Sequence, residues 1–166
     1  MIEKIKIAIT GHRPDKLGND YDLRSSLIDN IHLSILEILE SIDKDLNILP
    51  ITGMALGIDT LYALIAIELN LSFIAAIPCL NQESKWIEKS RKVYRDIINN
   101  PLCTVHYVTD GEYTQSCMQK RNEWMVDECN ELIAIWDGTS GGTSNCVKYA
   151  ESRSKKIHRV NPRFLR

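Results

Sequence analysis

Short apolar runs alternate along this chain with stretches whose apolar residues recur at helical spacing. The runs are rich in β-branched residues and lack the polar alternation of a half-exposed strand. We expect strands at 5–9, 48–51, 72–77, 103–108, 132–136 and 157–160. Such runs, separated by helices, are typical of a parallel sheet covered on both faces. The pattern therefore predicts an α/β fold with three layers, α/β/α, around a mostly parallel sheet.

The stretches between these runs predict helices. Apolar residues recur every three or four positions across 23–42, and a charged stretch, 84–98, has one apolar side. A further helix contains residues 118–129, and a short one surrounds 147–150. Residues 56–69 are nearly all apolar, which predicts a helix that is buried on more than one face.

Length and composition narrow the class of protein. A chain of 166 residues without a linker predicts a single domain spanning 1–166. A net charge of −2 argues against a surface that binds long nucleic acids. The five cysteines form no C-x-x-C pair and have no zinc-ligand spacing, so we expect reduced thiols, a cytoplasmic location, no metal site and no cofactor. No apolar stretch is long enough to predict a membrane span.

Three segments rich in glycine and polar residues each follow an expected strand. They are Gly11–Arg13, Gly53–Gly57 and Asp137–Asn145, and Ile-Thr-Gly closes the strand at both 9–11 and 51–53. Ligands of parallel sheets bind beyond the carboxyl ends of the strands. Glycines allow close backbone approach, and the free N–H groups of a following helix attract anions. The segments therefore predict a phosphate cradle, although no dinucleotide-binding G-x-G-x-x-G or P-loop motif is present.

The candidate ligand-binding residues come from these segments and from the helix that contains 118–129. They are Gly11, His12, Arg13, Gly53, Met54, Ala55, Gly57, Arg121, Asn122, Asp137, Gly138, Gly141, Gly142, Thr143 and Asn145. Arg13 is favoured as an anion ligand because a guanidinium binds phosphate bidentately. Arg121 either does the same or pairs with Glu123 or Asp127 on its own helix.

Several of these side chains have a second interpretation. His12 either contacts phosphate, caps a turn or acts as an acid or base. Asn145 either bonds a ribose hydroxyl or caps a helix. Asp137 is the candidate catalytic carboxylate, but an Asx turn that holds the glycine loop is the favoured interpretation. Asp59 could also supply a carboxylate, although an acid in the first turn of a helix is explained by the helix dipole.

The motifs in combination resemble those of one family. Thr10–Pro14, Gly53–Asp59, Arg121–Asp127 and Trp136–Gly138 with Gly141–Thr143 are similar to the YpsA-like branch of the SLOG superfamily. The resemblance spans nearly the whole chain and implies a Rossmann-like fold with a nucleotide-like ligand over the glycine loops. The superfamily includes phosphoribohydrolases, the DNA-processing protein A and sensors of nucleotide-derived signals, so the resemblance does not choose between these functions.

One departure from the enzymes of the superfamily bears on function. Phosphoribohydrolases carry Pro-Gly-Gly-x-Gly-Thr-x-x-Glu, and aligning Gly142-Thr143 with it puts Cys146 in place of the catalytic glutamate. A thiol cannot stabilise an oxocarbenium-like transition state as a carboxylate does. We therefore favour a protein that binds a nucleotide or an ADP-ribose-like nucleotide sugar as sensor, carrier or sequestering protein.

Two other functions stay open. One is an N-glycosidase acting on a nucleoside monophosphate or NAD-like substrate, with Asp137 as the candidate carboxylate. The other is single-stranded DNA binding, which is implied by the resemblance of Gly53–Asp59 to the DNA-processing family and is opposed by the acidic net charge. The resemblance also implies a homo-oligomer, and the apolar helix at 56–69 would be suited to its interface.

Overall fold

The computed structural model describes residues 2–165, so Met1 and Arg166, the ends of the predicted domain, lie outside it. Its sheet has the strand order β4-β3-β2-β1-β5-β6, and every neighbouring pair is parallel. The strands are β1 (Ile5–Gly11), β2 (Ile48–Thr52), β3 (Phe73–Ile77), β4 (Cys103–Tyr107), β5 (Glu131–Ile135) and β6 (Lys156–Val160). The predicted parallel sheet is confirmed.

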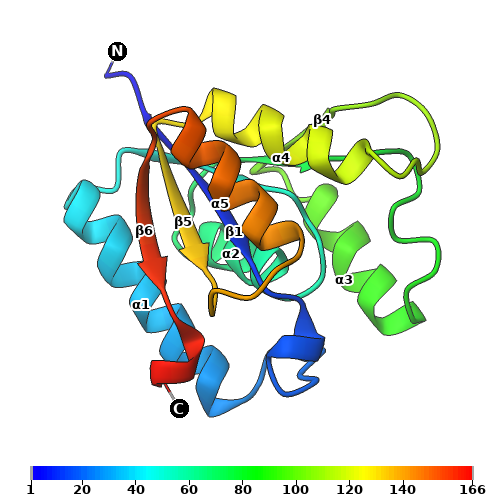
Figure 1. The fold of residues 1–166 in the computed structure, drawn as a ribbon, viewed down its shortest axis with the longest axis horizontal. Coiled ribbons are helices and arrows are strands. Elements are labelled where there is room, and N and C mark those ends of the chain that lie inside the picture. The colour runs from blue at the N-terminus through cyan, green and yellow to red at the C-terminus, as the bar shows by residue number, and fades with distance from the viewer. Residues whose placement is uncertain (1, 166) are drawn as a thin grey trace.

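Helices cover both faces of the sheet (Figure 1). α1 (Ser26–Ile42), α2 (Ile58–Glu68) and α3 (Glu88–Ile98) lie on one face, and α4 (Cys117–Glu128) and α5 (Gly142–Ser152) lie on the other. Short 3-10 helices occupy Pro14–Lys16 and Pro162–Leu165. None of the helices within residues 2–165 has the length and apolarity needed to cross a membrane. The three-layer Rossmann-like architecture is as predicted.

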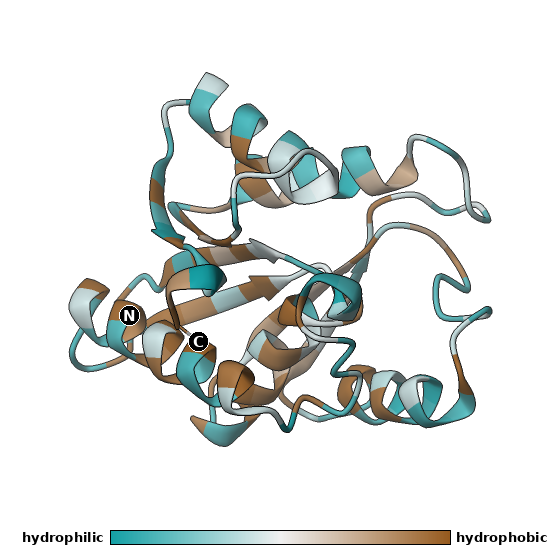
Figure 2. Cartoon of the chain, turned by 60° about the horizontal axis from the view of Figure 1, so that its bottom comes forward, coloured by the Kyte–Doolittle hydropathy of each residue, from teal (hydrophilic) through white to brown (hydrophobic). Residues whose placement is uncertain are grey.

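Side chains of successive residues alternate across the sheet and pack in cores on both of its faces. Ile7 and Ile9 of β1 pack with α1 and α2, whereas Ala8 between them packs with α4 and α5. Figure 2 shows the apolar residues gathered on the strands and on the helix sides that face them. Both faces of the four central strands, β1, β2, β3 and β5, are thus largely withdrawn from water, as their apolar sequences predict, whereas the edge strands β4 and β6 are partly exposed.

α2 is buried on several sides, as its sequence predicts. Leu61 and Ile65 pack in the core with α1, whereas Ala63 and Ala66 pack in the core with α3. The hydroxyl of Tyr62 donates to the Ile7 carbonyl oxygen at 3.0 Å, so its buried polar atom is paired. Packing within one chain therefore accounts for the apolarity of this helix, and the homo-oligomer stays a prediction.

Three helices begin later than their apolar patterns suggest. α1 begins at Ser26 rather than at Leu23, whose φ of 57° is not helical. The Ser25 hydroxyl accepts a hydrogen bond from the Ile28 N–H at 3.3 Å and caps the helix there. α2 begins at Ile58 rather than at position 56, and α3 begins at Glu88 rather than at 84, because Gly57 and the extended Ile87 precede them.

The strand order reverses beside β1. The chain proceeds from β1 to β2, β3 and β4 on one side, and then crosses over to β5 and β6 on the other. Gly11 pairs with Ile135 in the register of β1 and β5, so the segments that follow these two strands start side by side. A crevice at this reversal is where parallel sheets bind ligands.

Candidate functional site

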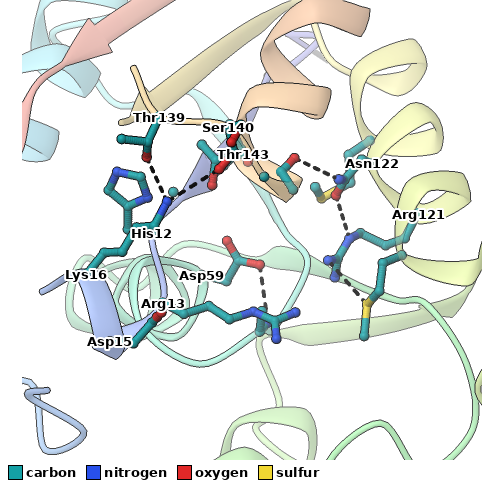
Figure 3. A pocket seen from close by; sticks show the side chains of 17 residues that line it. His12, Arg13, Asp15, Lys16, Asp59, Arg121, Asn122, Thr139, Ser140 and Thr143 are labelled. Atoms are coloured by element: carbon teal, nitrogen blue, oxygen red, sulfur yellow. Dashed lines mark hydrogen bonds between the residues drawn. The ribbon is translucent and has the colours of Figure 1, made fainter. Parts of the chain in front are cut away.

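A cavity of about 340 Å³ opens at the carboxyl ends of β1 and β5 (Figure 3). The first turn of α2, one side of α4 from Met118 to Met125, and the start of α5 complete its wall. Nine of the predicted ligand-binding residues line it: Gly11, His12, Arg13, Ala55, Arg121, Asn122, Gly141, Gly142 and Thr143. The fold therefore brings segments from four parts of the chain to one hollow.

Arg121 places a buried cation in this wall. Its side chain is 4% exposed, and its Nε donates to Asn122 Oδ1 at 2.9 Å while a terminal nitrogen donates to the Gly53 carbonyl oxygen. Burial lowers the pKa of the guanidinium, although Asp59 nearby raises it. Within residues 2–165 no carboxylate lies within 4.0 Å of it, so the predicted alternative, a pair with Glu123 or Asp127, is not formed.

The start of α5 faces the same cavity. Gly141 has a φ of 140° and precedes the helix, and the first helical N–H to find a partner is that of Asn145, which donates to the Gly141 carbonyl at 3.0 Å. The N–H groups of Gly142 and Thr143 come before that bond, as at any helix start. Asn122 Nδ2 donates to the Gly142 carbonyl at 3.5 Å and ties α4 to α5. The positive end of the α5 dipole is thus directed at the cavity.

Two more cations stand at the rim. Lys16 Nζ donates to Thr139 Oγ1 at 2.7 Å and to the Ser140 carbonyl at 3.5 Å, which joins the turn after β1 to the loop after β5. Arg13 is exposed and also lines the cavity. With Arg121 the wall holds three cations, against two acids, Asp15 and Asp59. This excess suits an anionic ligand.

Asp59 is the acid that lies deepest in the wall. It sits in the first turn of α2, is 6% exposed, and its Oδ2 accepts the Ala55 N–H at 3.2 Å. Burial raises the pKa of its carboxyl, whereas Arg121, the Ala55 N–H and Arg13 lower it. Asp59 lies at the positive end of a helix, where an acid is favourable, and it also lines the cavity.

His12 and Asp137 link the ends of β1 and β5. His12 Nε2 lies 3.0 Å from the Asp137 backbone nitrogen and 2.9 Å from its carboxylate. Burial lowers the pKa of His12 although Asp137 raises it, so the ring is neutral near pH 7. A neutral Nε2 accepts the Asp137 N–H. The ring therefore holds two loops together at the edge of the cavity.

The carboxylate of Asp137 is used within its own loop. It accepts the Thr139 N–H at 3.0 Å and hydroxyl at 2.6 Å, and it pairs with Arg163 at 3.2 Å. The hydrogen bonds from the Thr139 hydroxyl and the Thr139 N–H hold the pKa of this carboxyl well below its usual range. The favoured Asx turn is formed. Asp137 lines a neighbouring hollow, with Lys16 and Arg163, rather than the main cavity.

The remaining predicted residues lie behind or beside the cavity. They are Gly53, Met54, Gly57, Gly138 and Asn145. Met54 is fully buried, and Gly57, with a φ of 89°, packs so closely under the His12 carbonyl that a side chain would collide with it. Asn145 is exposed on α5. These residues shape or flank the wall without lining it.

Cys146, which aligns with the catalytic glutamate of the phosphoribohydrolases, is fully buried. It packs with Ala8, Met125 and Leu132 in the core between the sheet and the helices α4 and α5. Burial raises the pKa of its thiol to about 12, so it behaves as a small hydrophobic side chain. Among residues 2–165 no group of three His, Cys, Asp or Glu side chains could hold a metal ion.

The family follows from a direct comparison. The model of the YpsA family, described as the YspA SLOG family, matches residues 7–165. The chain belongs to the YpsA family of SLOG proteins. This SLOG protein is similar to the SPbeta prophage-derived protein YoqJ of Bacillus subtilis, with 30% identity over 149 residues, 80% of this chain and 86% of YoqJ.

Solved structures share the SLOG fold. DNA processing protein A of Helicobacter pylori superposes with a TM-score of 0.65 and 18% identity over 96% of this chain. The same protein of Streptococcus pneumoniae gives 0.63 and 18% over 95% of this chain. The SLOG chain spans 66% of the first protein and 50% of the second. At this identity the likeness establishes the fold alone.

Sequence reasoning missed several lining residues of this SLOG site. They are Thr10, Asp15, Lys16, Met118, Met125, Thr139 and Ser140, and Asp59 was considered but not chosen. Thr139 and Ser140 lie inside the predicted segment Asp137–Asn145, so the position of that segment could have identified them as lining residues. Lys16 follows Pro14 in a segment without regular pattern, and only the 3-10 turn at Pro14–Lys16 brings it to Thr139.

Proposed function

We propose that this SLOG protein binds a nucleotide or nucleotide-sugar ligand by its phosphate, and acts as a sensor, carrier or sequestering protein. The observation that carries the proposal is the buried Arg121 guanidinium, which lines the cavity without a carboxylate partner within residues 2–165. A buried charge is costly unless an opposite charge compensates it. A phosphate between Arg121 and the start of α5 would supply that charge.

The geometry of the cavity suits a phosphate ester. A guanidinium binds two phosphate oxygens at once, and free N–H groups at a helix start bind a third. The space beside Gly141 and Gly142 is empty, because a Cβ at either position would meet nothing within 4 Å. A ligand can therefore approach the backbone N–H groups there. A volume of about 340 Å³ is at the lower end of small-ligand sites. Met118 and Met125 add an apolar side for a base or sugar ring.

Titration calorimetry with nucleoside monophosphates, NAD, ADP-ribose and cyclic ADP-ribose variants tests the proposal. At least one nucleotide should bind to the wild type. Gly142→Glu puts a negative side chain at the start of α5 and should abolish that binding. Gly111→Glu is the matched control, since Gly111 is exposed in a loop outside the cavity with open space around it. The proposal fails when none of these nucleotides binds.

An N-glycosidase is the second candidate. Asp59 favours it, because a buried carboxyl with a raised pKa in the cavity wall could serve as a general acid. Asp137 is the other candidate carboxylate. Cys146 at the position of the catalytic glutamate argues for binding instead. Incubation with nucleoside monophosphates and NAD, followed by chromatography, should show free base only if this second candidate is correct.

Single-stranded DNA binding is the third candidate. The structure of the Helicobacter pylori relative describes a single-stranded DNA binding mode. The net charge of −2 opposes a strong electrostatic contribution here. A mobility shift of single-stranded DNA at low salt that weakens as salt rises would favour this candidate, and no shift at low salt would exclude it.

Three further expectations belong to the proposal. We expect residues 1–166 to form one domain, the protein to be cytoplasmic, and the chain to form a homo-oligomer. Size-exclusion chromatography with light scattering measures the oligomeric state directly. A mass equal to that of one chain over a range of concentrations would contradict the last expectation.

A further inference from the structure

Asp59 presents an acid to a cavity whose other features attract an anion. The side chain is more than nine-tenths buried, and only Oδ2 has a hydrogen-bond donor, the Ala55 N–H. Within residues 2–165 the other oxygen, Oδ1, accepts no hydrogen bond, and it is not sealed from the cavity. Figure 3 shows the carboxyl pointing into the hollow between Arg13 and the start of α5, where Ser140 and Thr143 lie.

A bound phosphate would make no favourable contact with the Asp59 carboxylate. An ionised carboxylate only accepts hydrogen bonds and repels a second anion. The nearby cations do not neutralise it by contact, because neither Arg13 nor Arg121 lies within 4.0 Å of it. A buried carboxylate is stabilised by a hydrogen-bond donor. The hydroxyl groups of a sugar are neutral donors, and a sugar can carry both these hydroxyls and a phosphate group.

We propose that Asp59 Oδ1 accepts hydrogen bonds from sugar hydroxyl groups of the ligand, so that the site selects phosphorylated sugars over inorganic phosphate. The inference rests on the proposed phosphate-binding function. It divides the cavity into a phosphate end, formed by Arg121 and the start of α5, and a sugar end, formed by Asp59. The ligand class is then a sugar phosphate or a nucleotide with free sugar hydroxyls.

The chain offers a substitution that separates this role from a structural one. Asp59→Asn keeps the shape of the side chain and an oxygen that can accept the Ala55 N–H, but it removes the charge and presents an amide to the cavity. Asp110→Asn is the matched control, because it removes the same charge from an exposed loop position that does not line the cavity. A loss of structure would weaken every ligand, whereas loss of the sugar contact changes the ratio between ligands.

Calorimetry with inorganic phosphate, ribose 5-phosphate and 2-deoxyribose 5-phosphate provides the test. We expect the wild type to prefer ribose 5-phosphate over inorganic phosphate by about 10-fold or more, as a hydrogen bond to a charged group allows. Asp59→Asn should lose about that factor for ribose 5-phosphate while inorganic phosphate binds as well as before or better. Asp110→Asn should keep the preference. The deoxy sugar reports whether the 2-hydroxyl is one of the donors.

The outcomes separate the two proposals. If the wild type binds inorganic phosphate and Asp59→Asn leaves the preference unchanged, the sugar-binding role is wrong and the phosphate site stands. If the wild type shows no preference for ribose 5-phosphate, the role of Asp59 is also wrong. If neither phosphate nor the sugar phosphates bind, the inference fails, and if no nucleotide binds either, the proposed function fails with it.

Discussion

Arg121, in α4, donates a hydrogen bond to the carbonyl oxygen of Gly53, which directly follows β2 and lies 68 residues earlier in the chain. The guanidinium lies over the glycine so closely that a Cβ at this position would overlap with it. Gly53 was predicted to bind the ligand through its backbone. The structure gives it another task, which is to make room for the cation that lines the cavity.

Gly53→Ala should therefore displace Arg121. We expect a loss of about 1–3 kcal/mol in the free energy of unfolding from overpacking, measured by urea denaturation. Nucleotide affinity should fall about 10-fold because the guanidinium moves. Gly111→Ala, with open space at its Cβ, is the control and should leave both quantities nearly unchanged. Equal behaviour of the two variants would contradict the packing argument.

Arg121→Lys retains a positive charge but removes the planar fork. We expect calorimetry to show an affinity for nucleoside monophosphates about 10-fold weaker, because an ammonium cannot bind two phosphate oxygens in the same geometry. The control is Arg153→Lys, at an exposed position where the arginine contacts Tyr149 on the surface. If both variants bind equally well, Arg121 does not hold the phosphate.

His12 should make the stability depend on pH. Its folded-state pKa is lowered from 6.5 by burial, so the unfolded chain binds the proton more tightly. The contribution to stability is then fully present above about pH 6.5. It is lost as the pH falls from there toward the lower folded pKa. Urea denaturation between pH 5 and 8 should show this decline, and His12→Gln should make the curve flatter in that window.

Asp137→Ala tests whether that carboxylate serves the loop or catalysis. Removing it leaves the Thr139 hydroxyl and N–H without their acceptor, so we expect a loss of about 1–3 kcal/mol in the free energy of unfolding. Asp110→Ala, at an exposed loop position, should cost much less. Release of free base by the wild type but not by Asp137→Ala would show that Asp137 is catalytic and would contradict the structural role.

Local pattern was sufficient to predict the architecture of this chain. Residues 5–9 and 132–136 carry no polar alternation because both faces of β1 and β5 are covered, and that condition is visible in the sequence itself. Helix starts were predicted less well. The cap at Ser25 and the left-handed backbone of Leu23 make α1 begin later than its apolar pattern suggests, and a periodic run of apolar residues does not record either feature.

The candidate site was predicted in part for the same reason. Glycine loops after strands mark the carboxyl edge of the sheet, so Gly11 and Gly142 could be placed there from the sequence. Which side chain of a loop faces the cavity depends on tertiary packing. Arg121 covers Gly53, and Lys16 reaches Thr139 across 123 residues, and no local pattern encodes either contact.

A crystal of the protein soaked with a mixture of nucleotides tests the central claim most directly. The account predicts electron density for a phosphate between the Arg121 guanidinium and the N–H groups of Gly142 and Thr143, with a sugar hydroxyl near Asp59. Soaked crystals of Gly142→Glu should show no such density. Nucleotide density elsewhere on the protein, with this cavity empty in the wild type, would contradict the account.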